Sequence, residues 1–304
     1  MSVYHTPVML KECLDGLNIK PDGIYVDVTF GGGGHSRAIL EQLTTGKLYA
    51  FDQDADAKEQ AKQIDDKNLI FVEANFRSIK QYLRLYGVKK ADGILADLGI
   101  SSHQIDTPER GFSTRYDADL DMRMNQNAPI SAKNIVNEYS IDDLHKILGM
   151  YGEIKNAKTA AQTIYTARLN RKIETINDLK GILQKLAPRS KENKYFAQVF
   201  QALRIVVNEE MVVLEDFLKQ TPEVLAPEGR LVVMAYHSLE DRLVKNFIRS
   251  GKFSGEVEKD LFGNDIKPLE SVIRKAIEAS PEEVEQNPRA RSAKLRIAEP
   301  TPLK

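Results

Sequence analysis

The chain has 304 residues, which is enough for two domains or for one domain that carries a large insertion. Apolar residues make up 42% and charged residues 29%, as is ordinary for a globular protein. The formal net charge of −1 gives no argument for nucleic acid from the whole chain, so such a partner must be sought in local patches. The single cysteine, Cys13, excludes an intrachain disulfide. No apolar run approaches about 20 residues and no signal-peptide pattern is present, so we expect a cytoplasmic protein without a membrane span.

Short apolar runs bounded by turn residues predict a series of strands. The first four are residues 24–29, 47–51, 69–72 and 93–98, a fifth is 229–235, and residues 292–298 alternate as in an edge strand. Helical patterns separate the early strands, as in βαβ units with a parallel sheet. The sequence therefore predicts an α/β protein.

Four consecutive glycines, residues 31–34, follow the first predicted strand and precede a helical pattern. Glycine weakens helices and strands, so this glycine loop indicates special dihedrals or close approach of a ligand to the backbone. Its N–H groups suit a nucleotide-like cofactor. Asp52 ends the second strand, 25 residues after Asp27, where doubly wound folds place an acid on ribose hydroxyls. No Gly-Lys-Ser/Thr follows, which excludes a P-loop, but the loop alone leaves a nicotinamide cofactor open.

Polar residues also follow the third and fourth strands. Phe76 comes just after the third strand, where an aromatic ring either flanks a purine or joins the core. Asp97 ends the fourth strand, and Ser101, Ser102 and Gln104 come close behind it. Because ligands of open α/β sheets bind beyond the carboxyl ends of the strands, we expect these groups at the reactive end of the cofactor.

About 130 residues separate the fourth and fifth strands, far more than a crossover needs. Helical patterns occupy residues 141–148, 157–169, 176–186 and 196–218, the last as one long helix that returns the chain to the sheet. We therefore predict a helical domain, residues 106–207, inserted into a cofactor-binding domain made of residues 1–105 and 208–304.

Residues 168–194 of the insertion carry eight basic and three acidic side chains. A solvated helix surface explains such a run, and so does a face that contacts RNA phosphates. The candidates for the second interpretation are Arg168, Arg171, Lys172, Lys185 and Arg189. Arg289 and Arg291 begin a second basic segment near the C-terminus, which is open to the same two interpretations.

His237 and Ser238 follow the fifth predicted strand, on the same edge of the sheet as Asp97. They are candidates for holding a substrate base or its phosphate, although a lone histidine is more often structural. No Cys/His cluster has the spacing of zinc ligands, and we predict no metal site.

Seven short motifs, taken in order along the chain, resemble those of one known family. They are Asp27-Val-Thr-Phe-Gly-Gly-Gly-Gly-His35-Ser36, Asp97-Leu-Gly-Ile-Ser-Ser102 with Gln104, Arg110-Gly-Phe-Ser113, Leu120-Asp-Met-Arg-Met124, Phe200-Gln-Ala-Leu-Arg204, His237-Ser-Leu-Glu-Asp-Arg242 and Asn287-Pro-Arg-Ala-Arg-Ser292. From His5-Thr6-Pro7-Val8 to Arg296-Ile-Ala-Glu299 the chain is similar to the ribosomal RNA small subunit methyltransferase H family. One such motif is weak, but seven in order are specific.

The resemblance implies a Rossmann-like class I methyltransferase fold, S-adenosylmethionine as cofactor, and N4 of a cytosine in the decoding region of 16S rRNA as methyl acceptor. It also implies 16S rRNA or the small ribosomal subunit as partner, and it favours a homodimer. The matching positions imply these cofactor contacts: Gly33, Gly34, His35, Asp52, Phe76, Asp97 and Gln104. Three alternatives stay open: a methylase of DNA or another RNA, a non-catalytic RNA-binding protein, and a nicotinamide-dependent oxidoreductase.

Methylation of cytosine N4 makes particular demands on the site. The amine is a poor nucleophile because its lone pair is delocalised into the ring, so N4 must be aligned with the methyl donor and its protons hydrogen-bonded. We hypothesise that Asp97 accepts from N4 or from the amino group of the cofactor. The other catalytic candidates are Ser101, Ser102, His237 and Ser238.

Overall fold

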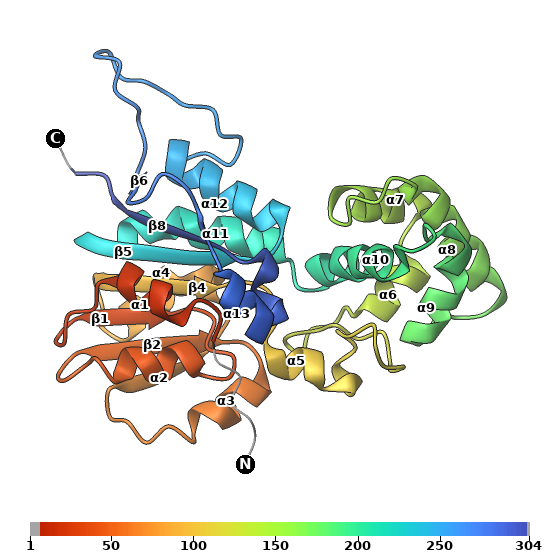
Figure 1. Ribbon diagram of the computed structural model, residues 1–304, viewed down its shortest axis with the longest axis horizontal. Coiled ribbons are helices and arrows are strands. Elements are labelled where there is room, and N and C mark those ends of the chain that lie inside the picture. Colours follow the sequence, from red (N-terminus) through yellow and green to blue (C-terminus); the bar gives the residue numbers. More distant parts are fainter. Residues whose placement is uncertain (1–6, 303–304) are drawn as a thin grey trace. The chain divides into compact units, whose positions relative to one another are not determined.

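A computed structural model describes residues 7–302, so His5 and Thr6 of the first matching segment lie outside the described residues. The described chain divides into two compact units, coloured along the sequence in Figure 1. One runs to Gly99 and resumes at Met211, and we call it the sheet unit; the other, Ile100–Glu210, is the helical unit. The domain boundaries expected from the sequence, 105/106 and 207/208, lie close to this division and stay predictions.

The sheet unit is built on an eight-stranded sheet in the order β3-β2-β1-β4-β5-β8-β6, with β7 paired to β8. The strands are β1 (Ile24–Asp27), β2 (Lys47–Asp52), β3 (Leu69–Glu73), β4 (Ala91–Asp97), β5 (Leu225–Ala235), β6 (Leu269–Ser271), β7 (Ile277–Glu278) and β8 (Lys294–Pro300). Strands β1 to β5 are parallel, whereas β8 is antiparallel to β5, β6 and β7. The mostly parallel sheet confirms the predicted Rossmann-like α/β fold.

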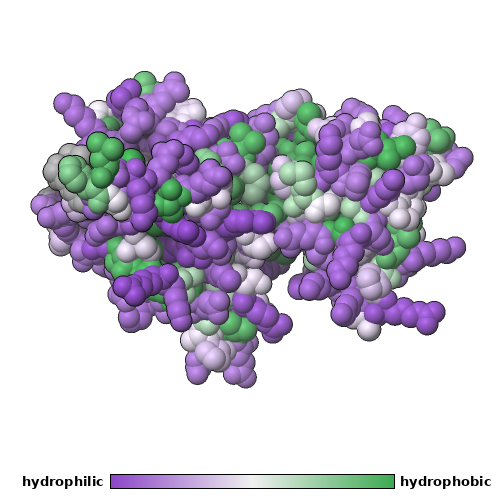
Figure 2. Space-filling view, turned by 90° about the horizontal axis from the view of Figure 1, so that it is seen from above, coloured by the Kyte–Doolittle hydropathy of each residue, from purple (hydrophilic) through white to green (hydrophobic). Residues whose placement is uncertain are grey.

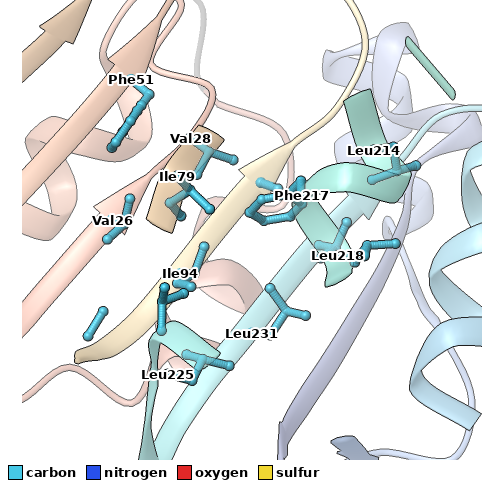
Figure 3. Close-up of a cluster of buried hydrophobic side chains, with 14 of the residues drawn as sticks. Val26, Val28, Phe51, Ile79, Ile94, Leu214, Phe217, Leu218, Leu225 and Leu231 are labelled. Carbon is cyan, nitrogen blue, oxygen red and sulfur yellow. The ribbon is translucent and has the colours of Figure 1, made fainter. Parts of the chain in front are cut away.

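Helices cover both faces of this sheet, and the central strands β1 and β4 bury side chains in both directions. Val26 and Ile94 pack with Phe217 in one hydrophobic cluster (Figure 3), while their strand neighbours Tyr25 and Leu95 belong to a second cluster. The helices of this unit are α1 (Leu10–Leu17), α2 (Gly34–Leu40), α3 (Ala55–Ala61), η1 (Phe76–Ser78), α4 (Ile79–Leu85), α11 (Glu210–Val224), α12 (Ser238–Ser250), α13 (Pro281–Gln286) and η4 (Pro288–Ser292).

The helical unit has a core of its own, which includes Leu144, Ile164 and Val199. Its helices are α5 (Ser102–Asp106), η2 (Pro108–Arg110), α6 (Ala132–Glu138), α7 (Ile141–Met150), α8 (Ala157–Asn170), α9 (Ile176–Leu183), η3 (Gln184–Leu186) and α10 (Glu192–Val207). The predicted helices at 141–148, 157–169 and 176–186 correspond to α7, α8, and α9 with η3.

The sequence patterns were wrong at two elements and did not indicate several others. The single helix expected at 196–218 is two helices, since α10 ends at Val207 and α11 begins at Glu210; Glu209 between them has φ 50°, outside the helical range. The expected edge strand at 292–298 is β8, which lies inside the sheet between β5 and β6. The patterns did not indicate α1, α5, α6, α12, α13, β6 or β7.

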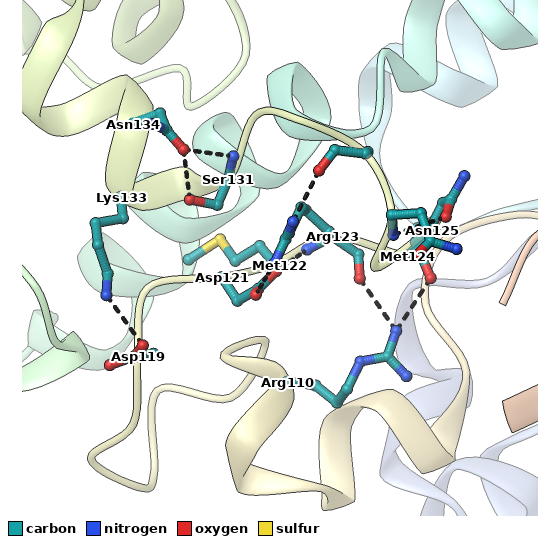
Figure 4. Close-up of polar contacts among 12 residues, drawn as sticks. Arg110, Asp119, Asp121, Met122, Arg123, Met124, Asn125, Ser131, Lys133 and Asn134 are labelled. Carbon is teal, nitrogen blue, oxygen red and sulfur yellow. Dashed lines mark hydrogen bonds and ion pairs between the residues drawn. The ribbon is translucent and has the colours of Figure 1, made fainter. Parts of the chain in front are cut away.

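Two of the matching motifs in the helical unit are joined by hydrogen bonds (Figure 4). The buried Arg110 side chain donates to the backbone carbonyls of Arg123 and Met124, at 3.0 and 3.1 Å. Gly111 next to it has φ 73°, and a Cβ there would lie 2.4 Å from the carbonyl oxygen of Asp119. Arg110-Gly-Phe-Ser113 and Leu120-Asp-Met-Arg-Met124 therefore form one folded loop region.

Hydrophilic side chains cover most of the face seen in Figure 2, and hydrophobic ones form small separate areas. Leu261 and Phe262, between α12 and β6, are the most exposed large hydrophobic side chains among residues 7–302. No helix within residues 7–302 has the length and apolar character needed to cross a bilayer.

Candidate active site

Three neighbouring parallel strands each end in an aspartate. Asp27 ends β1, Asp52 ends β2 and Asp97 ends β4, and β1 lies between β2 and β4 in the sheet. The carboxyl ends of parallel strands meet at one edge of a sheet, so three carboxyl groups gather at the edge where such folds bind ligands. Sequence reasoning singled out Asp52 and Asp97 but used Asp27 only as the start of a motif.

Asp27 supports the segment that follows β1. One carboxylate oxygen accepts from the backbone N–H of Thr29 at 3.0 Å, and the other accepts from the Ser36 hydroxyl at 2.7 Å. Burial raises the pKa of Asp27, and nearby His35 opposes that rise. The side chain is almost fully buried, and its two partners, Thr29 and Ser36, lie on either side of the glycine loop in the sequence. Asp27 therefore fixes the chain at both ends of this loop.

The glycine loop is tied to the end of β2. Asp52 Oδ2 accepts from the Gly31 N–H at 2.8 Å, and Oδ1 accepts from the Asp54 N–H at 2.9 Å. Burial raises the pKa of Asp52 to about 6. Gly33 has φ 77°, and a Cβ there would lie 2.7 Å from the Phe30 ring, so both the dihedral and the packing require glycine. The loop therefore has the tight geometry that its four glycines predicted.

Asp97 is held on three sides and is one-quarter exposed. Its backbone N–H donates to Thr29 Oγ1 at 2.7 Å, and its Oδ1 accepts from the Tyr236 hydroxyl at 2.7 Å. Its Oδ2 lies 3.7 Å from His35 Nδ1. Burial raises the pKa of Asp97 to about 6, and His35 and the Tyr236 hydroxyl only partly offset that rise.

The buried His35 ring has a defined orientation. Its Nε2 lies 3.1 Å from the carbonyl oxygen of Val8, and because a carbonyl can only accept, Nε2 carries a proton. Nδ1 then faces Asp97. The structure thus brings together two predicted residues, His35 and Asp97, with a third that the sequence did not single out. Sequence reasoning missed Tyr236 because an aromatic residue at the end of a strand is usually part of the hydrophobic core. Its position next to the candidate His237 could have identified it as a site residue.

The other predicted cofactor contacts have structural partners already. Phe76 is half-buried in η1, with its ring 5.3 Å from the Phe217 ring in an edge-on contact. In the helical unit, Ser101 and Gln104 form a capping box at the start of α5: the Gln104 N–H donates to Ser101 Oγ, and the Ser101 N–H donates to Gln104 Oε1. Ser102 is the first residue of that helix and is half-buried.

His237 and Ser238 begin α12 at the end of β5. His237 Nδ1 accepts from the Glu240 N–H at 3.4 Å, while Nε2 lies 3.2 Å from Glu240 Oε1 without the alignment of a hydrogen bond. Glu240 Oε2 in turn accepts from the Tyr236 N–H at 2.9 Å. His237 therefore serves as a helix cap, and Ser238 lines a hollow of about 290 Å³ beside Tyr236.

The predicted RNA-contacting residues differ in their surroundings. Arg168 donates to a backbone carbonyl of its own unit at 3.0 Å, and Arg171 lies 3.5 Å from Asp178. In the sheet unit, Arg289 is half-buried and Arg291 is exposed on η4. Three others are exposed and make no side-chain hydrogen bond or ion pair within residues 7–302: Lys172, Lys185 and Arg189.

A glycine loop and three carboxyl groups at the carboxyl edge of a doubly wound sheet define a Rossmann-like protein that binds a nucleoside cofactor. A sequence profile of the MraW methylase family matches residues 2–301. The chain belongs to this family and is an S-adenosylmethionine-dependent methyltransferase, which rules out the nicotinamide alternative and confirms the resemblance seen in the motifs.

Curated relatives are similar over nearly their whole length. The chain is 62% identical over 297 residues to the ribosomal RNA small subunit methyltransferase H of Cytophaga hutchinsonii, covering 98% of this chain and 99% of the relative. It is 56% identical to the protein of the same name from Christiangramia forsetii, with 97% of each covered. The corresponding protein of Parabacteroides distasonis is 54% identical, with 98% of each covered.

Proposed function

We propose that this methyltransferase transfers a methyl group to N4 of a cytosine in the decoding region of 16S rRNA, as naked RNA or within the small ribosomal subunit. The names of its relatives and the order of its motifs support this substrate. The observation that carries the chemistry is the position of Asp97 at the end of β4: Thr29 accepts from its backbone N–H, Tyr236 donates to its carboxyl group, and His35 faces that group.

The proposed cofactor contacts are the positions matched by the motifs: Gly33, Gly34, His35, Asp52, Phe76, Asp97 and Gln104. Asp52 provides a test of fit. An ionised carboxylate has about four lone-pair positions, and the N–H groups of Gly31 and Asp54 occupy two of them. Two positions are left for the two vicinal hydroxyls of a ribose, so the donor and acceptor count agrees with a nucleoside.

When bound, S-adenosylmethionine would supply a methyl group on a positively charged sulfur, and breaking of that sulfur–carbon bond would leave the neutral thioether S-adenosylhomocysteine. Asp97 then acts on the nucleophile: by accepting a hydrogen bond from the N4 amine it favours the lone pair on nitrogen over its delocalisation into the ring. As the N–C bond forms, N4 becomes acidic and releases a proton. A carboxylate with a pKa of about 6 is suited to accept it, because it is ionised at neutral pH yet only moderately acidic.

The remaining site residues take supporting roles in this proposal. Ser101 and His237 hold the starts of α5 and α12, while the hydroxyls of Ser102 and Ser238 are the candidates for contacting the target nucleotide. The inserted domain, residues 106–207, contacts RNA through Arg168, Arg171, Lys172, Lys185 and Arg189, and the other domain does so through Arg289 and Arg291. We also propose that the enzyme is cytoplasmic. We further propose that it acts as a homodimer, and analytical ultracentrifugation would test this oligomeric state.

The experiment that tests the substrate maps methylated nucleotides in 16S rRNA from cells with and without this chain. We expect loss of one N4-methylcytidine in the decoding region. A methyl group that persists without the chain, or purified protein that methylates DNA instead, would reject the proposal. The same assay on Asp97→Ala should show no transfer, because the variant lacks the hydrogen-bond acceptor. Unchanged binding of S-adenosylhomocysteine to that variant would assign Asp97 to N4, and lost binding would assign it to the cofactor.

A further inference from the structure

Two neighbouring hollows of the sheet unit share one lining residue, Lys294. The smaller, of about 290 Å³, is lined by Tyr236, His237 and Ser238 at the end of β5. The larger, of about 530 Å³, opens onto five cationic side chains from three parts of the chain, and we call it the cationic hollow. Those residues are Lys245 of α12, Arg274 and Lys275 between β6 and β7, and Lys294 and Arg296 of β8.

The sheet fixes where this hollow lies relative to the proposed site. In the β5–β8 pairing, Lys294 stands opposite Ala235 and Arg296 opposite Val233. Met234, between those two β5 residues, pairs with Asp97 of β4. Lys294 is therefore two strands from Asp97 at the same edge of the sheet. The hollows run from the end of β5 outward along β8.

Most of the positive charge in the cationic hollow lacks a local counterpart. Arg296 is held by Asp241 through two hydrogen bonds of 2.7 and 3.1 Å, and Lys294 lies 4.0 Å from Glu278. The other three cations are exposed and form no ion pair within residues 7–302: Lys245, Arg274 and Lys275. In the described part of the chain, Glu278 is the one acidic residue that lines this hollow, against five cations. Like charges in such excess repel one another, and a bound polyanion relieves that repulsion.

We propose that the cationic hollow binds backbone phosphates of the single-stranded RNA segment next to the target base. This inference rests on the proposed function, since it takes RNA as the substrate. The lysine and arginine side chains come from a helix, a loop and a strand, so their charges are spread over the hollow. Charges spread in this way suit the successive phosphates of a flexible single strand. Contacts of this kind position an RNA without reading its sequence, whereas selection of the cytosine belongs to the hollow beside Tyr236.

The test compares two double charge reversals. Lys245→Glu with Lys275→Glu removes two cations of the hollow. The control, Lys67→Glu with Lys89→Glu, makes the same change in net charge at exposed positions that precede β3 and β4, at the opposite ends of those strands. Binding of a fluorescent single-stranded RNA with the decoding-region sequence is measured by anisotropy over a series of salt concentrations. Calorimetry with S-adenosylhomocysteine reports whether each variant is folded.

We expect the hollow variant to bind this RNA on the order of tenfold more weakly than wild type. Its salt dependence should be shallower by about 1.4 in log–log slope, because each phosphate that is no longer neutralised by a side chain reduces the slope by about 0.7. Its KM for small-subunit particles should rise while kcat stays the same. The control should match wild type in all of these measurements, and both variants should bind S-adenosylhomocysteine normally.

Equal RNA affinity and salt slope in the hollow variant and in wild type would overturn the inference. So would an equal loss in the control, because net charge alone would then explain the effect. Failure of the proposed function gives a different result: the wild-type protein itself would transfer no methyl group to small-subunit particles.

Discussion

The carboxyl groups of Asp52 and Asp97 should make binding of the cofactor depend on pH. Burial raises the pKa of each from 3.8 to about 6, and both are proposed to accept hydrogen bonds from the cofactor or the base as ionised groups. Below pH 6 they take up protons, so affinity for S-adenosylhomocysteine should fall by about tenfold per pH unit for one required carboxylate and more steeply for two. Calorimetry from pH 5 to about pH 8 measures this change in affinity.

The free energy of unfolding of the free protein should change in the opposite direction. It should fall as pH rises from about 4 to 6, because the folded state holds these protons more tightly than the unfolded state does.

Tyr236 gives a control for that pH profile. Its hydroxyl donates to Asp97 and favours the ionised carboxylate, so Tyr236→Phe should raise the pKa of Asp97 further and move the midpoint of the profile upward. Tyr82→Phe removes a hydroxyl that makes no hydrogen bond within residues 7–302 and should leave the midpoint unchanged. A profile that does not shift in Tyr236→Phe would mean that Asp97 does not control binding of the cofactor.

At the scale of elements, the motif pair around Arg110 predicts a local loss of stability. Arg110→Ala removes a buried side chain that donates to two backbone carbonyls, which should cost about 2–4 kcal/mol. Urea unfolding followed by a probe in the helical unit measures the loss. Arg115→Ala, at an exposed position of the same loop region, should change stability by less than about 0.5 kcal/mol. Equal effects of the two substitutions would show that the buried hydrogen bonds of Arg110 do not contribute to the stability of the helical unit.

Elements that form through local patterns were predictable, and those that depend on distant partners were not. Strands β1, β2 and β4 bury nearly continuous apolar runs, and so does β5 from Leu231 to Ala235, which the sequence shows directly. The alternating pattern of β8 looks like an edge strand because Lys294 and Arg296 reach polar surroundings, but β6 and β7 cover its far side. The break at Asn208 and Glu209 interrupts no hydrophobic pattern, because backbone dihedrals end the helix there: Asn208 has φ −103° and Glu209 has φ 50°. Asp27 and Tyr236 were missed in the same way, because their roles come from contacts with Ser36 and Asp97.

At the scale of the whole molecule, each unit has a separate hydrophobic core, so reversing exposed charges on the helical unit should leave the fold of the sheet unit unchanged. We therefore predict that reversing Lys172, Lys185 and Arg189 to Glu weakens RNA binding. The salt dependence should become shallower by about 2 in log–log slope if each side chain contacts one phosphate. Affinity for S-adenosylhomocysteine should not change. RNA anisotropy and calorimetry on the same preparation measure both.

The control for this variant reverses three exposed lysines of the same unit that lie outside residues 168–194: Lys146, Lys155 and Lys158. It carries the same net charge, so a general electrostatic effect would weaken RNA binding equally in both variants. If RNA affinity is unchanged in the Lys172, Lys185 and Arg189 variant, the basic segment is only a solvated helix surface. In that case the phosphates must be held by the sheet unit, and the charge reversals at Lys245 and Lys275 should account for most of the salt-dependent affinity.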